Sequence, residues 1–170
     1  MQYDILFIFI LVILSIFSIQ GSIIGYFGLI YCFMLCSLGA AKGIYNISSC
    51  VSGTSIRSPS VGTKSILGTV VCEANFLSGI ITCVMAFGTL AKTSEIAVHY
   101  LYFCSSLFVG MCSYYSSIST GLICAVISMM DGKDPNVFYK VVVLEVIPAS
   151  VGLIGFILGI VMNSKADLLM

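Results

Sequence analysis

Two acidic residues, Glu73 and Glu145, stand inside long apolar stretches of this 170-residue sequence. Each follows a pair of valines and one intervening residue, in Val-Val-Cys-Glu and Val-Val-Leu-Glu, and each is followed five residues later by a serine. A repeated setting of this kind is typical of an internal duplication, which is a common way to build membrane rings and transporters.

A carboxyl group in the middle of a bilayer is costly when it is ionised, so it is seldom present without a partner or a function. No lysine or arginine is expected at the depth of Glu73 or Glu145, and each acid should therefore keep its proton while it faces lipid. An acid that releases this proton when it meets a cation on another subunit is a proton carrier. The alternative, a protonated side chain that only hydrogen-bonds a neighbouring helix, stays open above all for Glu145.

The composition places both acids in a membrane protein. Hydrophobic residues make up 59% of the chain and charged residues 8%, with a mean hydropathy of +1.15. Soluble domains carry about 25% charged residues, so this chain cannot cover a globular surface with polar groups. Seven scattered lysines and arginines exclude a nucleic-acid-binding surface, which needs clustered cations. The length leaves no room for a soluble catalytic domain beside four or five transmembrane helices.

Apolar runs predict the helices, at 5–19, 22–47, 65–91, 98–130 and 137–163. The last four runs are long enough to cross a bilayer. We therefore expect an all-α membrane protein of two tandem transmembrane hairpins, 22–91 and 98–163, with a tail at 164–170. Residues 1–21 are expected to hold a short N-terminal helix, and its length leaves open whether it spans the membrane.

The charges around the loops predict the orientation. Four lysines and arginines lie in or beside the loops 48–64 and 131–136, whereas two lie on the opposite side. The positive-inside rule therefore places these two loops in the cytosol. Lys42 lies near the end of the first predicted span, and its long stem is expected to carry the charge to the interface.

Small residues recur three or four positions apart in three of the four long runs. Lipid provides no hydrophobic force between helices, so faces of small residues serve close backbone packing. We expect helices packed into a ring, although ordinary packing within one bundle explains any single motif. The residues expected at these contacts are Gly110, Ser113, Ser117, Gly121, Gly152 and Gly155.

The cysteines indicate no metal site. None of the eight forms a Cys-x-x-Cys pair, and seven lie inside apolar runs. They are expected to be small buried hydrophobic residues rather than metal ligands or disulfides. The sequence also has no GxxxxGK[ST] phosphate-binding loop, so neither a nucleotide nor another cofactor is expected.

Several motifs, taken in their order and spacing, carry a resemblance to a family. They are 39–44 (Gly-Ala-Ala-Lys-Gly-Ile), 71–73 (Val-Cys-Glu), 137–145 (Val-Phe-Tyr-Lys-Val-Val-Val-Leu-Glu) and 152–155 (Gly-Leu-Ile-Gly). The chain resembles the proteolipid subunits of the vacuolar-type proton-translocating ATPase over about residues 24–165. In that family an acid in the second core helix and an extra N-terminal helix are features of the c″ proteolipid, which this chain resembles most.

The resemblance implies a rotor-ring protein of vacuolar or other endomembranes, with Glu73 as the principal proton carrier and Glu145 in a secondary or structural role. It implies other c-type proteolipids as ring neighbours, a stator a-type subunit that supplies an arginine, and a central-stalk d-type subunit on the cytosolic loops. Lipid surrounds the ring, and ATP hydrolysis belongs to a separate soluble sector, so no catalytic site is expected in this chain.

Three features depart from the family pattern. Lys42 stands where relatives tend to have an aromatic residue, the N-terminal extension is short, and Pro148 follows Glu145 by three residues. Proline removes a helix hydrogen bond, so a local kink is expected beside Glu145. Two alternatives remain: an ordinary c-type proteolipid of the same ring, and a four-span structural or pore-forming membrane protein.

Overall fold

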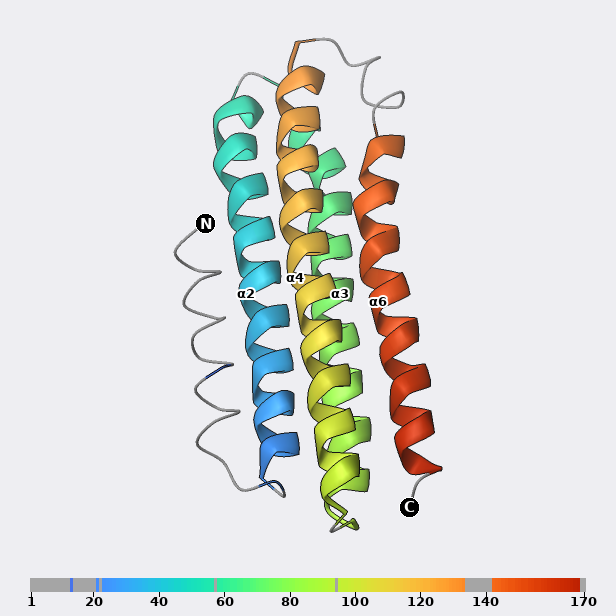
Figure 1. Cartoon of the computed structure of the whole chain (residues 1–170). Helices are drawn as coiled ribbons and strands as arrows, with labels where there is room; N and C mark the ends of the chain where they lie inside the picture. The colour runs from blue at the N-terminus through green and yellow to red at the C-terminus, as the bar shows by residue number, and fades with distance from the viewer. Residues whose placement is uncertain are drawn as a thin grey trace.

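The computed structural model describes residues 23–56, 58–93, 95–133 and 142–168, together with Ile13 and Gly21. Four long helices run up and down beside one another (Figure 1). They are α2 (Ile24–Ser55), α3 (Ser60–Leu90), α4 (Ile96–Asp131) and α6 (Val143–Asp167). The predicted all-α fold of four long helices is confirmed. The predicted N-terminal helix at 5–19 lies, apart from Ile13, outside the described residues.

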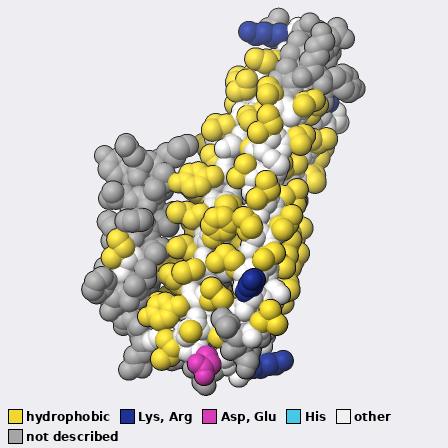
Figure 2. Space-filling view, turned by 45° about the vertical axis from the view of Figure 1, so that its right-hand side comes forward, with side chains coloured by type: hydrophobic (Ala, Val, Ile, Leu, Met, Phe, Trp, Pro, Cys, Tyr) yellow, Lys and Arg dark blue, Asp and Glu magenta, His cyan; other side chains and the backbone are white. Residues whose placement is uncertain are grey.

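Each of the four helices is long and apolar enough to cross a bilayer. At 1.5 Å per residue even α6, with 25 residues, is about 38 Å long, against a hydrocarbon core of about 30 Å. The face of the bundle seen in Figure 2 is covered with hydrophobic side chains, and its charged side chains lie mostly toward the two ends. This surface suits contact with lipid or with other apolar helices.

Helix α4 packs against all three other described helices. Its contact with α2 is made backbone to backbone, because a β-carbon added to Gly121 would lie 2.5 Å from the Cα of Gly43. A β-carbon on Gly39 would likewise lie 2.8 Å from the Cα of Tyr114. Only glycine allows two helices to approach this closely, as expected for packing in lipid.

Glycines also allow helix α6 to approach α4 closely. A β-carbon on Gly155 would overlap Cys112, and one on Gly159 would overlap Val109. The six small residues that we expected at ring contacts are all buried between helices of this one chain: Gly110, Ser113, Ser117, Gly121, Gly152 and Gly155. Packing between copies in a ring stays a prediction.

The first two helices extend further than predicted and leave a shorter loop between them. Helix α2 continues through the polar stretch 48–55 because hydroxyl groups there bond back along the helix. Ser48 donates to the carbonyl of Tyr45 at 3.0 Å, and Ser52 donates to that of Ser49 at 3.1 Å. Helix α3 starts directly after Pro59, whose φ of −60° suits a helix start.

The last helix is described from Val143 onward, and residues 134–141, which include the first five of the predicted 137–163 run, lie outside the described part. Helix α6 is one helix across Pro148. Proline has no N–H group, so the carbonyl of Leu144 lacks its usual helical donor.

Candidate functional site

Glu73 lies near the middle of α3, about 20 Å along the helix axis from Ser60 at 1.5 Å per residue. Its side chain is exposed. Val70 and Leu77, one turn away on the same face, are 55% and 56% exposed. The acid therefore projects from an apolar outer surface of the bundle.

The opposite side of α3 faces the rest of the chain. Its buried residues follow one another at spacings of three and four: Ser65, Gly68, Cys72, Asn75, Gly79, Thr82, Ala86 and Leu90. Glu73 falls outside this series. No hydrogen bond or ion pair joins its carboxyl group to another residue in the described part of the chain. Glu73 is thus an acid at mid-helix that has no hydrogen-bond or ion-pair partner among the described residues, and its side chain faces the surroundings of the bundle.

Glu145 has a different environment. It lies in the first turn of α6 as described, and it is only 4% exposed. Its Oε1 atom is buried without a hydrogen-bond partner among the described residues. A β-carbon added to Gly68 would lie 2.9 Å from this Oε1 and 2.8 Å from the Cβ of Cys124. Glu145 therefore points inward, where α3, α4 and α6 meet.

The sequences around the two acids are similar, but their positions in the structure are not. Glu145 lies beside Gly68, which is five residues and about 7 Å of helix rise away from Glu73. The two acids also face opposite ways, one outward and one inward. The repeated peptide indicates a duplication, but it does not determine whether each helix turns its acid toward a neighbouring helix or toward the surroundings of the bundle.

The expectation that no lysine or arginine lies at the depth of Glu73 is wrong. A β-carbon on Gly43 would lie 2.8 Å from the Sγ of Cys72, so the backbone at Lys42 lies at the level of Glu73. Its ammonium group donates to the Tyr114 hydroxyl at 3.2 Å and lies 5.7 Å from the centre of that ring. The ammonium group therefore lies between α2 and α4, and its reach to the interface stays a prediction.

A buried polar cluster that we did not predict lies behind Glu73. The amide nitrogen of Asn75 donates to the hydroxyls of Ser116 and Ser117, at 2.9 and 3.2 Å. Ser116 in turn donates to the carbonyl of Pro148 at 2.7 Å. The signal in the sequence was an asparagine within an apolar run, because a buried amide in lipid needs a partner.

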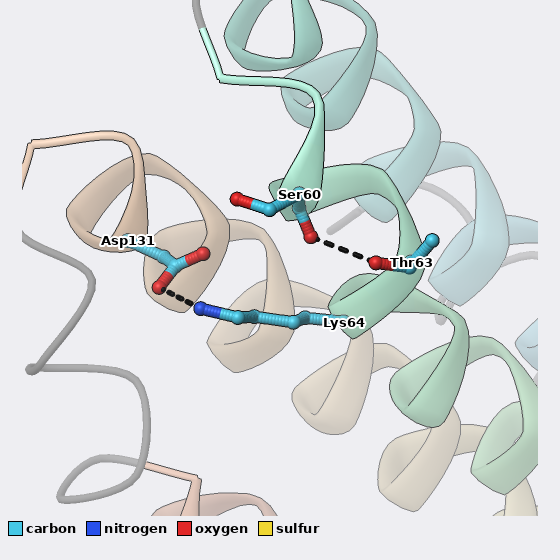
Figure 3. Close-up of polar contacts among 4 residues, drawn as sticks. All are labelled: Ser60, Thr63, Lys64 and Asp131. Carbon is cyan, nitrogen blue, oxygen red and sulfur yellow. Dashed lines mark hydrogen bonds and ion pairs between the residues drawn. The ribbon is translucent and has the colours of Figure 1, made fainter.

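The end of the bundle that holds the loop between α2 and α3 carries an ion pair. Lys64, in the second turn of α3, lies 2.7 Å from the carboxylate of Asp131 at the end of α4 (Figure 3). The side chain of Asp131 is 1% exposed, and that of Lys64 is 23% exposed. This pair fixes the start of α3 against α4 on the side that we predict to be cytosolic.

A groove of about 240 Å³ opens between the two helices that carry the acids. Its lining is apolar except for Asn75 and Ser78. It includes Val70 and Ala74, which flank Glu73 in α3. In the described residues no group of three His, Cys, Asp or Glu side chains could hold a metal ion.

Comparisons with known proteins agree with the duplicated pattern. Residues 27–86 and residues 103–162 each match the family model of the ATP synthase C subunit. The c″ subunit of the Saccharomyces cerevisiae V-type proton ATPase is 28% identical over 148 residues, which cover 82% of this chain and 70% of that protein. The c″2 subunit of the Arabidopsis thaliana enzyme is 28% identical over 137 residues, covering 76% and 77%. The c′ subunit of the Candida glabrata enzyme is 24% identical over 145 residues, covering 84% and 88%.

Proposed function

Because this chain belongs to the family of the ATP synthase C subunit, as a c″-like proteolipid of the V-type ATPase rotor, we propose that Glu73 is its proton-carrying residue. A proteolipid of this kind is a multi-pass protein of endomembranes, and ATP is hydrolysed by other subunits of the complex. The chemistry left to this chain is the reversible protonation of one carboxyl group.

The observation that carries the proposal is the exposure of Glu73 at mid-helix on an apolar outer face. A group that exchanges protons with a second protein must reach the surface of its own chain. The carboxyl of Glu73 does so, and no described residue engages it. Among the apolar side chains around it, the neutral acid is the form that contact with lipid tolerates.

The cycle that follows has two states of one side chain. The Glu73 carboxylate accepts a proton from the cytosolic side and becomes neutral. The ring then carries the neutral acid through lipid until it meets an arginine of the stator a-type subunit. The arginine stabilises the carboxylate, so the proton leaves toward the lumen. Other c-type proteolipids complete the ring, and the loops at the cytosolic end contact a d-type subunit of the central stalk.

Glu145 takes a structural role in this proposal. Its carboxyl is buried between three helices of its own chain, where a stator arginine could reach it only if those helices separated. An ordinary c-type proteolipid, which carries its proton on the acid of the last helix, would need that acid at the surface. The burial of Glu145 therefore favours the c″-like assignment of the carrier.

The test is Glu73→Gln in the intact complex. We expect the complex to assemble but to lose ATP-driven acidification of vesicles, because glutamine cannot bind and release a proton. Glu73→Asp should keep partial activity, since it retains the titrating group with a shorter reach. Normal pumping by assembled Glu73→Gln complexes would refute the carrier role.

A further inference from the structure

We propose that Asn75 is a positioning residue, which fixes the rotation of α3 so that Glu73 points out of the bundle; this rests on the proposed carrier role of Glu73. Successive residues of an α-helix are about 100° apart around its axis, so residues 73 and 75 project from nearly opposite sides. Whatever holds Asn75 against α4 thereby directs Glu73 away from α4.

The neighbours of Asn75 on the buried side of α3 cannot do this as well. Gly68 and Gly79 present no side chain, and Cys72 makes only a weak thiol hydrogen bond, to the carbonyl of Ser117 at 3.5 Å. Small residues allow close approach over a broad arc of rotation, and lipid supplies no hydrophobic force that distinguishes inside from outside. Hydrogen bonds are directional. The two bonds from Asn75 to Ser116 and Ser117 therefore specify the rotation that the small residues leave loose.

The hydrogen bonds of this cluster also connect α6 to α3 and α4, so the position of α6 supports the rotation of α3. Ser116 accepts a hydrogen bond from Asn75 and donates its own to the carbonyl of Pro148, which links three helices in one chain of bonds. Space for the cluster comes from Gly152, where an added β-carbon would lie 2.5 Å from the Asn75 Oδ1 and 2.8 Å from the Ser116 Oγ. Asn75 is 6% exposed, so the amide is committed to these partners and not to solvent.

The experiment measures which way Glu73 points, in complexes that have assembled. Complexes carrying Asn75→Leu are treated with a hydrophobic carbodiimide, and the rate of labelling at Glu73 is followed by peptide mapping. Leucine is similar in length and branching to asparagine but makes no hydrogen bond. We expect the equilibrium between outward and rotated Glu73 to shift about three- to tenfold toward the rotated form, the factor that one or two interhelical hydrogen bonds supply in a membrane, and labelling to slow as the outward population falls. The rate of ATP-driven proton pumping should fall with it.

Ser78→Ala is the matched control. Ser78 lies one turn further along α3, and among the described residues its hydroxyl bonds only within the helix, to the carbonyl of Asn75 at 2.7 Å. This variant should label and pump like the unmodified complex. If Asn75→Leu does not assemble, Ser116→Ala removes one of the two partners from the opposite helix and should slow labelling by a smaller factor.

Labelling at the unmodified rate in Asn75→Leu, or in Ser116→Ala where only that variant assembles, would overturn the proposal. Labelling reports the accessibility of Glu73 whether or not Glu73 carries protons. A complex in which Glu73→Gln still pumps refutes the carrier role, whereas the labelling rates decide the positioning role by themselves.

Discussion

Helices α3 and α6 invite comparison, because each carries a glutamate after a Val-Val-x sequence and yet they present it in opposite directions. Glu73 is exposed on the outer face of α3, and Glu145 is 4% exposed on the inner face of α6. The difference follows from where each acid stands relative to the small residues of its helix. Small residues face a neighbouring helix in lipid, so an acid in line with them is buried and an acid out of line with them is exposed.

Spacing along each helix supports this explanation. Glu145 is separated by three, seven and ten residues from Pro148, Gly152 and Gly155, which places all four on one face. Glu73 is separated by five residues from Gly68 and by six from Gly79, which places it on another face from either glycine. The residues directly beside an acid thus indicate less about its role than whether the acid lies on the same helix face as the glycines that pack against a neighbour.

The largest expected effect is the contrast between Glu145→Gln and Glu73→Gln. Glu145→Gln should retain most of the proton pumping, because a buried glutamine can replace a neutral acid in packing, whereas Glu73→Gln should abolish it. Both are measured as ATP-driven acidification by assembled complexes in vesicles. Loss of pumping in assembled Glu145→Gln complexes would reverse the roles of the two helices.

Chemical labelling sharpens the same contrast. A hydrophobic carbodiimide reaches carboxyl groups from the lipid, so it should modify Glu73 in preference to Glu145 in the unmodified complex. Peptide mapping of the labelled chain measures the ratio. A label found chiefly on Glu145 would mean that the inner junction of α3, α4 and α6 opens to lipid during turnover.

A third test fills the space at Gly68, beside the carboxyl group of Glu145. Gly68→Ala places a methyl group 2.9 Å from the carboxyl oxygen of Glu145 and against Cys124, so the helices must shift. We expect a loss of about 1–3 kcal/mol of stability, the usual range for an overfilled site. Gly62→Ala is the control, since a β-carbon there meets nothing within 4 Å. The measurement is the temperature at which the chain leaves the detergent-purified complex, and equal temperatures for the two variants would show that this space is not tight.

The smallest expected effect concerns the anchors of the two helices. Helix α3 is anchored at its start by the Lys64–Asp131 ion pair, and α6 is bonded to α4 where Ser105 donates to the Oδ1 of Asn163 at 2.7 Å. Lys64→Gln leaves the buried Asp131 carboxylate without this charge partner and should cost about 1–2 kcal/mol. Lys133→Gln, at an exposed neighbouring position, should change stability by less than about 0.5 kcal/mol. The same thermal assay ranks the two, and a larger loss for Lys133→Gln would contradict the anchoring role.

Much of the fold was predictable because a long apolar run in a chain with few charges can satisfy its backbone in lipid only as a helix. The ends of the helices were less predictable. Helix α2 runs on to Ser55 because the serines and threonines after residue 47 bond back to its own carbonyls, which a search for apolar runs does not detect.

The sequence by itself determined the membrane location, the four long helices, the duplicated hairpins and the presence of an acid in α3 and in α6. Composition and periodicity are sufficient for these, since they depend on the contrast between lipid and water. Only the tertiary structure decided that Lys42 rests on Tyr114, that Glu145 lies against Gly68, and that Asn75 bonds to α4. The physical reason is that inside a bilayer the protein interior and its surroundings are equally apolar. Which helix a face meets, and at what rotation, is therefore set by specific hydrogen bonds and close backbone contacts between residues far apart in the chain.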